Sequence, residues 1–178
     1  MGDGFREKGA GDMDWIGDIA EAWRHEYPDL DASSMAPLVR LARLGILIEG
    51  FQQEVLEPFA LAPSDYSVLA ALRRSGKPYA LNPSQLYTRL QRSSGGMTKI
   101  LGRLEDGGLV RRVDNPEDRR GSIISLTRRG LSIQDRAFNP FLTASGTLLA
   151  PLSDRQQAAA DRSLSVLLDV LEAPGEQG

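Results

Sequence analysis

The side chains with the clearest chemistry in this sequence are basic, and they are concentrated in one stretch. Between Arg89 and Arg129 the chain has ten basic and five acidic residues, whereas residues 1–30 contain three basic and eight acidic ones. The net charge of the whole chain is −3, so the positive stretch is a local feature. Lysine and arginine bind phosphate oxygens, and local charge decides whether a surface binds a nucleic acid. The charge distribution therefore predicts a segment that binds a polyanion.

Reactive side chains of other kinds are scarce. The sequence has no cysteine and one histidine, His25, which excludes disulfides, thiolate metal sites and a multi-histidine metal site within one subunit. It also lacks a glycine-rich phosphate loop, a Gly-x-Ser-x-Gly motif and a His-Glu-x-x-His motif. We therefore expect that the protein is not an enzyme and that it needs no cofactor and no metal.

Two short helices are predicted in the first half of the basic stretch. Pro83 begins the first helix. The backbone N–H groups of a first helical turn have no partner within the helix, so proline, which has no N–H, fits there without losing a hydrogen bond. This helix ends near Gln91. Ser93 or Ser94 caps the second helix through a side-chain oxygen, and the glycines at 107–108 end it. One face of the second helix has the apolar spacing of a buried surface, at Met97, Ile100, Leu101 and Leu104.

A β-hairpin is predicted in the second half of the stretch. Two β-branched runs at 109–113 and 122–126 flank a charged, turn-forming segment at 114–121, and a very short third strand is expected at 79–82. Two helices followed by a hairpin with a basic tip form a winged helix-turn-helix. The second helix fits the major groove of DNA, and the hairpin can reach the backbone or the minor groove.

Five short motifs occur in order across these elements: SSGGMT at 93–98, RLE at 103–105, GGLVRR at 107–112, DRRG at 118–121 and LTRRG at 126–130. Together with the flanking helices, they resemble the MarR family of bacterial transcription regulators over roughly residues 35–172. The resemblance implies a homodimer in which the first and last helices of two subunits interlock. It also implies a double-stranded, pseudo-palindromic operator and, most often, repression.

The predicted fold is mainly α with a small β-hairpin wing, and four segments are expected along the chain. These are a disordered N-terminus at 1–12, an N-terminal extension with dimerisation helices at 13–58, the winged helix-turn-helix DNA-binding domain at 59–129 and C-terminal dimerisation helices at 130–178. The amphipathic helix expected at 13–26 resembles the extra N-terminal helix of a MarR subgroup. No apolar run is long enough to span a membrane, and the acidic start is not a signal peptide, so we expect a cytoplasmic protein.

The predicted DNA-binding residues lie on the second helix, beside it and on the wing. Small residues at a helix N-terminus allow close approach to phosphate, and Thr98 and Lys99 can reach base edges. Arg103 could contact a phosphate or pair with Glu105 or Asp106. The resemblance implies that the arginine before Gly121 pairs with the aspartate two residues earlier and aims the wing at the minor groove. The full set is Arg89, Arg92, Ser93, Ser94, Gly95, Thr98, Lys99, Arg103, Asp118, Arg119 and Arg120.

The resemblance also implies a small-molecule effector, since MarR-type dimers often bind aromatic or carboxylate-bearing compounds between the dimer helices and the DNA-reading domain. The subgroup with the extra helix includes urate-type sensors, whose pattern is a tryptophan on that helix, an aspartate early in the helix before the DNA-reading pair and an arginine on the recognition helix. Trp23 fits, but the aspartate position corresponds to Ser67, with Asp65 nearby, and the arginine position to Lys99. These four residues are the candidate effector site for an anionic or aromatic ligand, although urate is not expected; alternatively, none of them binds a ligand.

Two other functions remain open at this point. The chain could be a winged-helix DNA-binding protein that needs no effector, or a module that uses its winged helix to bind another protein. Titration of ligands against a DNA complex separates the first from a ligand-responsive regulator. Failure to bind any DNA at low salt favours the second.

Overall fold

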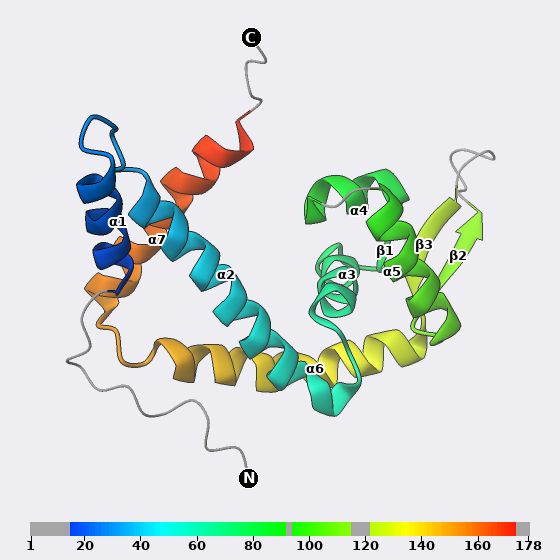
Figure 1. Ribbon diagram of the computed structural model, residues 1–178. Coiled ribbons are helices and arrows are strands. Elements are labelled where there is room, and N and C mark those ends of the chain that lie inside the picture. The colour runs from blue at the N-terminus through cyan, green and yellow to red at the C-terminus, as the bar shows by residue number, and fades with distance from the viewer. Residues whose placement is uncertain (1–14, 92–93, 115–121, 174–178) are drawn as a thin grey trace. The chain divides into compact units, whose positions relative to one another are not determined.

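The computed structural model describes residues 15–91, 94–114 and 122–173 (Figure 1). Most of these residues are helical, and three short strands form an antiparallel sheet in the order β1-β3-β2. The predicted class, mainly α with a small β-hairpin, is confirmed. The predicted disordered N-terminus at 1–12 and the tip of the wing lie outside the described residues. The chain divides into two compact units, one up to Gln52 and one from Gln53.

The first unit contains α1 (Trp15–Glu26) and most of α2 (Met35–Leu56). The predicted helix at 13–26 is confirmed in type, and it begins at Trp15 among the described residues. The rings of Trp23 and Tyr27 stack with centroids 5.6 Å apart where α1 ends. Large apolar side chains nevertheless stay exposed on both helices, at Trp15, Trp23, Leu38, Leu44, Ile46 and Ile48.

The second unit is built around α3 (Pro63–Arg74), which follows a short 3-10 turn at Glu57–Phe59. Val68, Leu69 and Leu72 of α3 are completely buried, and α3 contacts α4 (Pro83–Leu90), α5 (Ser94–Asp106), β3 (Ser122–Leu126) and α6 (Arg128–Leu149) (Figure 1). This hydrophobic core, which removes apolar surface from water, fixes the elements that carry the predicted DNA-binding residues. The other fully buried large side chains are Leu56, Leu86, Met97, Leu101, Leu104 and Ile124.

The sheet gives the wing its base. β2 (Val110–Asp114) pairs with β3 from Val110 opposite Leu126 to Asp114 opposite Ser122. β1 (Ala80–Leu81) pairs with the other edge of β3, which confirms the very short third strand. The segment that joins β2 to β3, residues 115–121, is the predicted tip.

Local capping interactions set most helix boundaries. Asn82 accepts a hydrogen bond from the Gln85 backbone N–H at 2.8 Å, and its own N–H donates to the Gln85 side chain at 3.0 Å; this capping box precedes Pro83. Gln91, in the left-handed conformation, ends α4, and Gly108, with φ 65°, follows α5 as expected of a glycine there. Ser153 forms a second capping box at the start of α7 (Asp154–Glu172).

The start of α6 is joined closely to the base of the wing. The hydroxyl of Thr127 donates to the Gly108 carbonyl at 2.7 Å and accepts the Gly130 N–H at 3.0 Å, while the Thr127 N–H donates to the Leu109 carbonyl at 3.1 Å. A β-carbon at Gly130 would lie 1.9 Å from that same Leu109 oxygen. Only glycine therefore allows α6 to approach the backbone this closely.

Within the described part of the chain, no helix has both the length and the apolar character needed to cross a bilayer.

Candidate nucleic-acid interface

The second helix of the helix-turn-helix is α5, and its two faces differ sharply. Met97, Ile100, Leu101 and Leu104 are buried, as the apolar spacing predicts. Gly95, Thr98 and Lys99 are exposed, which places three of the predicted DNA-binding residues on one outward face. An α-helix with small and polar outward residues can enter the major groove and reach base edges.

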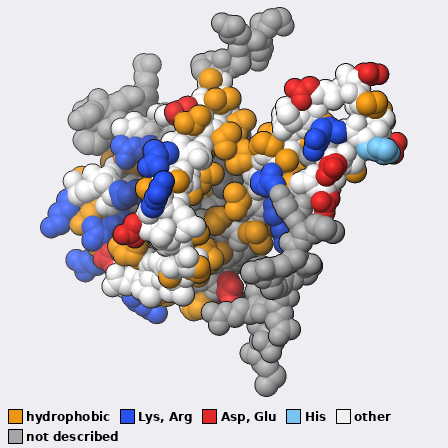
Figure 2. All heavy atoms as spheres, turned by 90° about the vertical axis from the view of Figure 1, so that its left-hand side faces the viewer, with side chains coloured by type: hydrophobic (Ala, Val, Ile, Leu, Met, Phe, Trp, Pro, Cys, Tyr) orange, Lys and Arg blue, Asp and Glu red, His pale blue; other side chains and the backbone are white. Residues whose placement is uncertain are grey.

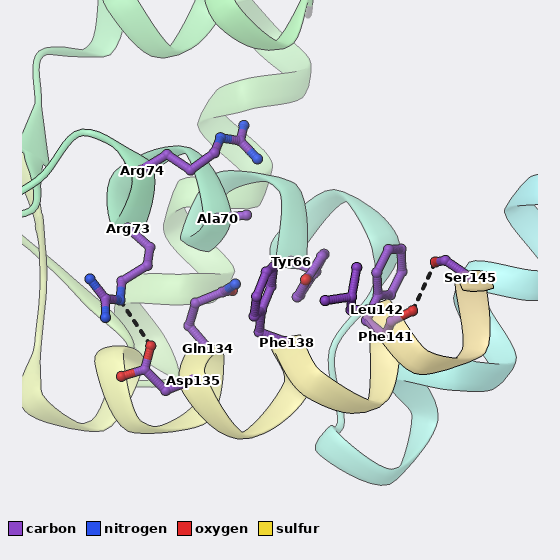
Figure 3. A pocket seen from close by; sticks show the side chains of 10 residues that line it. All are labelled: Tyr66, Ala70, Arg73, Arg74, Gln134, Asp135, Phe138, Phe141, Leu142 and Ser145. Carbon is purple, nitrogen blue, oxygen red and sulfur yellow. Dashed lines mark hydrogen bonds and ion pairs between the residues drawn. The ribbon is translucent and has the colours of Figure 1, made fainter. Parts of the chain in front are cut away.

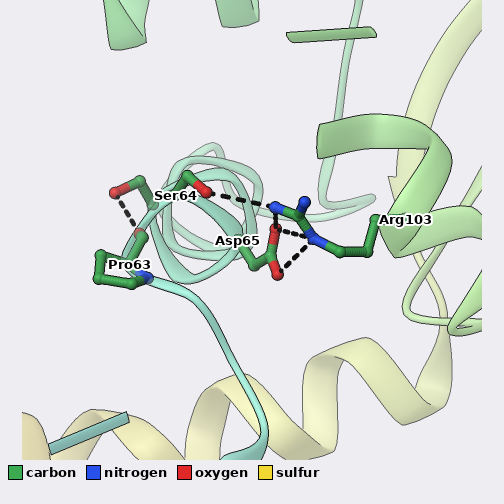
Figure 4. A network of polar contacts seen from close by, with 5 residues as sticks. Pro63, Ser64, Asp65 and Arg103 are labelled. Atoms are coloured by element: carbon green, nitrogen blue, oxygen red, sulfur yellow. Dashed lines mark hydrogen bonds and ion pairs between the residues drawn. The ribbon is translucent and has the colours of Figure 1, made fainter. Parts of the chain in front are cut away.

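Arg103 lies on α5 but turns toward α3, where it pairs with Asp65 (Figure 4). Its Nε lies 3.1 Å and 3.0 Å from the two carboxylate oxygens, and Nη2 also donates to Oδ1. A weaker contact of 3.4 Å joins Nη2 to the hydroxyl of Ser64. The hydrogen bond to Asp65 raises the pKa of Arg103 above its ordinary value, against the opposing effect of burial. The expectation that Arg103 pairs with Glu105 or Asp106 is therefore wrong, because packing of α5 on α3 brings a more distant carboxylate within reach.

Glu105 has a different partner, Arg112 on β2. The Arg112 Nε lies 3.1 Å from one Glu105 carboxylate oxygen and 3.2 Å from the other. Both side chains are partly exposed, so this pair contributes little to stability, but it joins α5 to the wing strand. Arg111, the preceding residue of β2, is exposed.

The remaining predicted DNA contacts are only partly described. Arg89 is exposed in the last turn of α4, next to the turn before α5. Ser94 is the first residue of α5, but its side chain is outside the description. Five predicted contacts fall entirely outside the described residues, namely Arg92, Ser93, Asp118, Arg119 and Arg120.

The four candidate effector residues come from both units of the chain. Trp23 belongs to α1 of the first unit, whereas Lys99 is exposed on α5. The hydroxyl of Ser67 donates to the Pro63 carbonyl at 2.9 Å, within its own helix. Asp65 is buried against Arg103, and the two line an open cleft of about 400 Å³. The chain thus has an aspartate, Asp65, on the helix before the DNA-reading pair and an arginine, Arg103, on the recognition helix. These two side chains form an ion pair.

A larger cavity, of about 500 Å³, lies between α3 and α6 (Figure 3). Its walls include Tyr66 and Phe141, whose rings stack with centroids 4.8 Å apart. Burial raises the pKa of Tyr66, although a hydrogen bond from Gln134 and the charge of Arg74 act in the opposite direction. Sequence reasoning missed this cavity, because its walls come from helices far apart in the chain. No cluster of three or more potential metal-binding side chains occurs among the described residues.

Comparison with known proteins connects this geometry to one family. The MarR family profile matches residues 61–121, from the start of α3 to the wing. The regulator PecS of Dickeya dadantii (strain 3937), named an HTH-type transcriptional regulator, is 34% identical over 142 residues, covering 80% of this chain and 86% of PecS. The multiple antibiotic resistance protein MarR of Escherichia coli (strain K12) is 32% identical over 80 residues, covering 45% of this chain and 54% of MarR.

Solved structures of MarR-type regulators also have folds similar to the fold of this chain. A crystal structure of a mutant Escherichia coli MarR complexed with operator DNA has a TM-score of 0.68 and 26% identity, covering 74% of this chain and 94% of the other. Sco3205 of Streptomyces coelicolor, a MarR family transcriptional regulator in complex with DNA, has a TM-score of 0.72 and 24% identity, covering 83% and 92%. At 24% identity, the likeness to Sco3205 shows that the two proteins share a fold and shows nothing more.

Proposed function

This chain is a DNA-binding transcription regulator of the MarR family, and we propose that it acts as a homodimer that represses from a pseudo-palindromic operator until a small molecule releases it. The observation that carries the proposal is the outward face of α5, where Gly95, Thr98 and Lys99 are exposed while the opposite face is buried in the core. As a regulator that acts on the bacterial chromosome, it would work in the cytoplasm.

In the proposed complex, α5 lies in the major groove and the wing follows the backbone or the minor groove. Gly95 has no side chain to obstruct a phosphate, Thr98 and Lys99 reach base edges, and Arg89 neutralises backbone charge. Arg92, Ser93, Ser94, Arg119 and Arg120 would complete the interface, with Asp118 orienting the wing. Arg103, which is engaged by Asp65, would position α5 instead of contacting DNA.

A homodimer would explain the exposed apolar surface. No residue of α7 is buried within its own chain, yet large hydrophobic side chains on α6 and α7 are exposed. Figure 2 shows hydrophobic side chains at the surface of the protein. Contiguous exposed apolar surface on a folded protein marks an interaction site. The residues concerned are Phe138, Leu142, Leu148 and Leu149 on α6, Leu152 between the two helices, and Leu164, Val166, Leu168, Val170 and Leu171 on α7.

The effector would act through the geometry of the dimer. Binding of a small molecule would favour a dimer whose two α5 helices no longer match the spacing of the half-sites. Trp23, Asp65, Ser67 and Lys99 are the residues that the family pattern suggests. A regulator without an effector, or a protein-interaction module, would replace this proposal if the experiment below gave the corresponding result.

The test is selection of bound fragments of the source genome by the purified full chain, in moderate salt with competitor DNA, together with sedimentation analysis of the protein. We expect a dimer and enrichment of a palindromic site of about 16 to 20 base pairs, with half-sites one helical turn apart. The genes beside the site would then suggest effectors to test for release. No enrichment, even after unfolding and refolding to remove a bound ligand, would contradict the proposal and favour a protein partner.

Lys99→Ala is expected to weaken binding to the selected operator about tenfold and binding to an unrelated duplex much less, because a base contact carries sequence information. Fluorescence anisotropy at two salt concentrations measures both affinities. Arg155→Ala, which removes one exposed positive charge from α7, serves as the control and should leave both unchanged. An equal loss on both duplexes would show that Lys99 contacts only phosphate.

A further inference from the structure

Tyr79, the residue before β1, has a backbone conformation that tyrosine rarely adopts. Its φ is 61°, in the left-handed region that favours glycine. Two other non-glycine residues of the described chain, Ala60 and Gln91, share this conformation, but each of them ends a helix, where it is common. A bulky residue stays in this conformation only when its surroundings hold it there. The contacts of Tyr79 therefore offset an unfavourable backbone conformation.

Both the backbone and the ring of Tyr79 make such contacts. Its N–H donates to the carbonyl of Gly76 at 2.6 Å, and its carbonyl accepts the N–H of Leu126, at the end of β3, at 3.1 Å. The ring is partly buried against the core, and the Arg73 guanidinium lies 4.9 Å from the centre of the ring. A guanidinium over an aromatic face is attracted by the negative charge of that face. Glycine at position 79 would keep the backbone bonds but lose both ring contacts.

Arg73, at the end of α3, is itself held from another helix. Its Nε donates to the carboxylate of Asp135 on α6 at 2.8 Å (Figure 3). The two side chains are 40% and 51% exposed, and ion pairs so accessible to water contribute little to stability. The pair does, however, fix the direction of the guanidinium. At this point α3, α6 and the sheet are joined through Tyr79.

The contacts of Tyr79 lie at the base of the wing. Leu126 is the last residue of β3, whereas Ser122 is the first and adjoins the tip at 115–121. A strand rises about 3.3 Å per residue, so roughly 13 Å separates the two ends of β3. We therefore expect any influence of Tyr79 or Arg73 on DNA binding to act through the position of the sheet, without a direct contact to phosphate.

We propose that Tyr79, held by Arg73, is the residue that positions the wing for DNA binding. The sheet cannot rotate against α3 and α6 without breaking the ring contact or the hydrogen bond to Leu126. The pair between Glu105 and Arg112 joins the opposite edge, β2, to α5, so the sheet is held at both edges. The inference rests on the proposed function, because it requires that the wing contacts DNA while α5 lies in the major groove.

The experiment measures operator affinity of the full chain and its variants at several salt concentrations. Tyr79→Leu removes the ring, and Arg73→Gln removes the charge above it. Each should weaken binding about tenfold and reduce the slope of log affinity against log salt by about one to two, because a displaced tip loses phosphate contacts. Tyr79→Phe keeps the ring and should bind as the natural chain does.

Arg74→Gln is the matched control for charge. It removes an equal charge from the neighbouring, exposed residue of α3 and leaves the Arg73 guanidinium over the Tyr79 ring, so it should change affinity and slope little. Asp135→Asn keeps the shape of the side chain but removes its charge, and it should give a smaller loss in the same direction as Arg73→Gln. Thermal unfolding shows that each variant is folded.

A wing without its tip arginines separates positioning from general damage to the domain. In a chain that carries Arg119→Ala and Arg120→Ala, the tip has few contacts left to lose. Adding Arg73→Gln or Tyr79→Leu to that chain should therefore lower operator affinity no further. A substitution that damaged the whole DNA-binding domain would lower affinity in both backgrounds.

Two results would overturn the inference. The first is that Arg73→Gln and Tyr79→Leu bind with the affinity and slope of Arg74→Gln. The second is an equal loss with and without the tip arginines, which would make the contact of Tyr79 purely structural. Either result leaves the proposed function standing if the natural chain binds its operator. If the natural chain binds no operator, or if loss of the tip arginines leaves its affinity unchanged, the proposed function or its wing contact fails and the inference fails with it.

Discussion

Gly130→Ala is expected to destabilise the winged helix by about 3 kcal/mol, because the added β-carbon would lie 1.9 Å from the carbonyl oxygen of Leu109. That oxygen cannot move away easily, since it accepts the Thr127 N–H at 3.1 Å. The β-carbon would also lie 3.2 Å from a methyl group of Leu126. Either the start of α6 or the base of the hairpin must shift, and both movements open the core.

Gly146→Ala provides the matched control on the same helix. A β-carbon at Gly146 meets nothing within 4 Å, so alanine there should stabilise the protein by about 0.5 to 1 kcal/mol through its higher helix propensity. Chemical denaturation followed by circular dichroism measures both changes. If Gly130→Ala unfolds at the same denaturant concentration as the natural chain, the close contact between α6 and Leu109 does not exist in solution.

Removal of Arg103 and removal of Asp65 are expected to lower the free energy of unfolding by different amounts. The Asp65 side chain is 7% exposed and the Arg103 side chain 53%. Arg103→Met leaves a buried carboxylate without its main partner, and we expect a loss of about 2 kcal/mol, less than for a fully buried pair because water reaches the guanidinium. Asp65→Asn should cost only about 1 kcal/mol, since the freed arginine can turn to solvent. The double variant should be more stable than the sum of the single losses predicts.

DNA binding by the same variants separates a positioning role from a phosphate contact. If Arg103 only positions α5, Arg103→Met and Asp65→Asn should both weaken operator binding, and the salt dependence of binding should stay the same. If Arg103 contacts a phosphate, Arg103→Met alone should reduce the slope of log affinity against log salt by about one. Additive losses of stability in the double variant would show that the two side chains do not interact in solution.

Much of the fold follows from local sequence signals, because caps and turns depend on residues close together in the chain. Thr127 caps α6, Ser153 caps α7 and Gly108 follows α5 as their chemistry predicts. The residues at 79–82 predict a short strand before Pro83, whereas the structure shows that Asn82 instead forms a capping box at the start of α4. The spacing of Asn82 and Gln85 fits the capping-box pattern and could have revealed it.

The candidate sites were harder to predict, because they depend on packing between distant segments. Arg103 and Asp65 are 38 residues apart, and nothing in the sequence near Arg103 distinguishes Asp65 from the closer carboxylates Glu105 and Asp106. Gln134 was equally hidden, since a single glutamine in an amphipathic helix is ordinarily a solvated residue. Only the packing of α6 against α3 buries it beside Tyr66.

The absence of buried residues along α7 has a consequence for how the regulator behaves in a cell. A helix with no buried residue in its own chain gains little stability from the rest of the fold, and in the proposed homodimer a second molecule would supply the missing stability. Folding of α7 would then obey mass action, and we expect amide hydrogen exchange in α7 to slow as the protein concentration rises, while exchange in α3 stays the same. The number of copies per cell would thus set both how often the operator is occupied and how many chains have a folded C-terminal helix. Dilution at cell division would lower the two together.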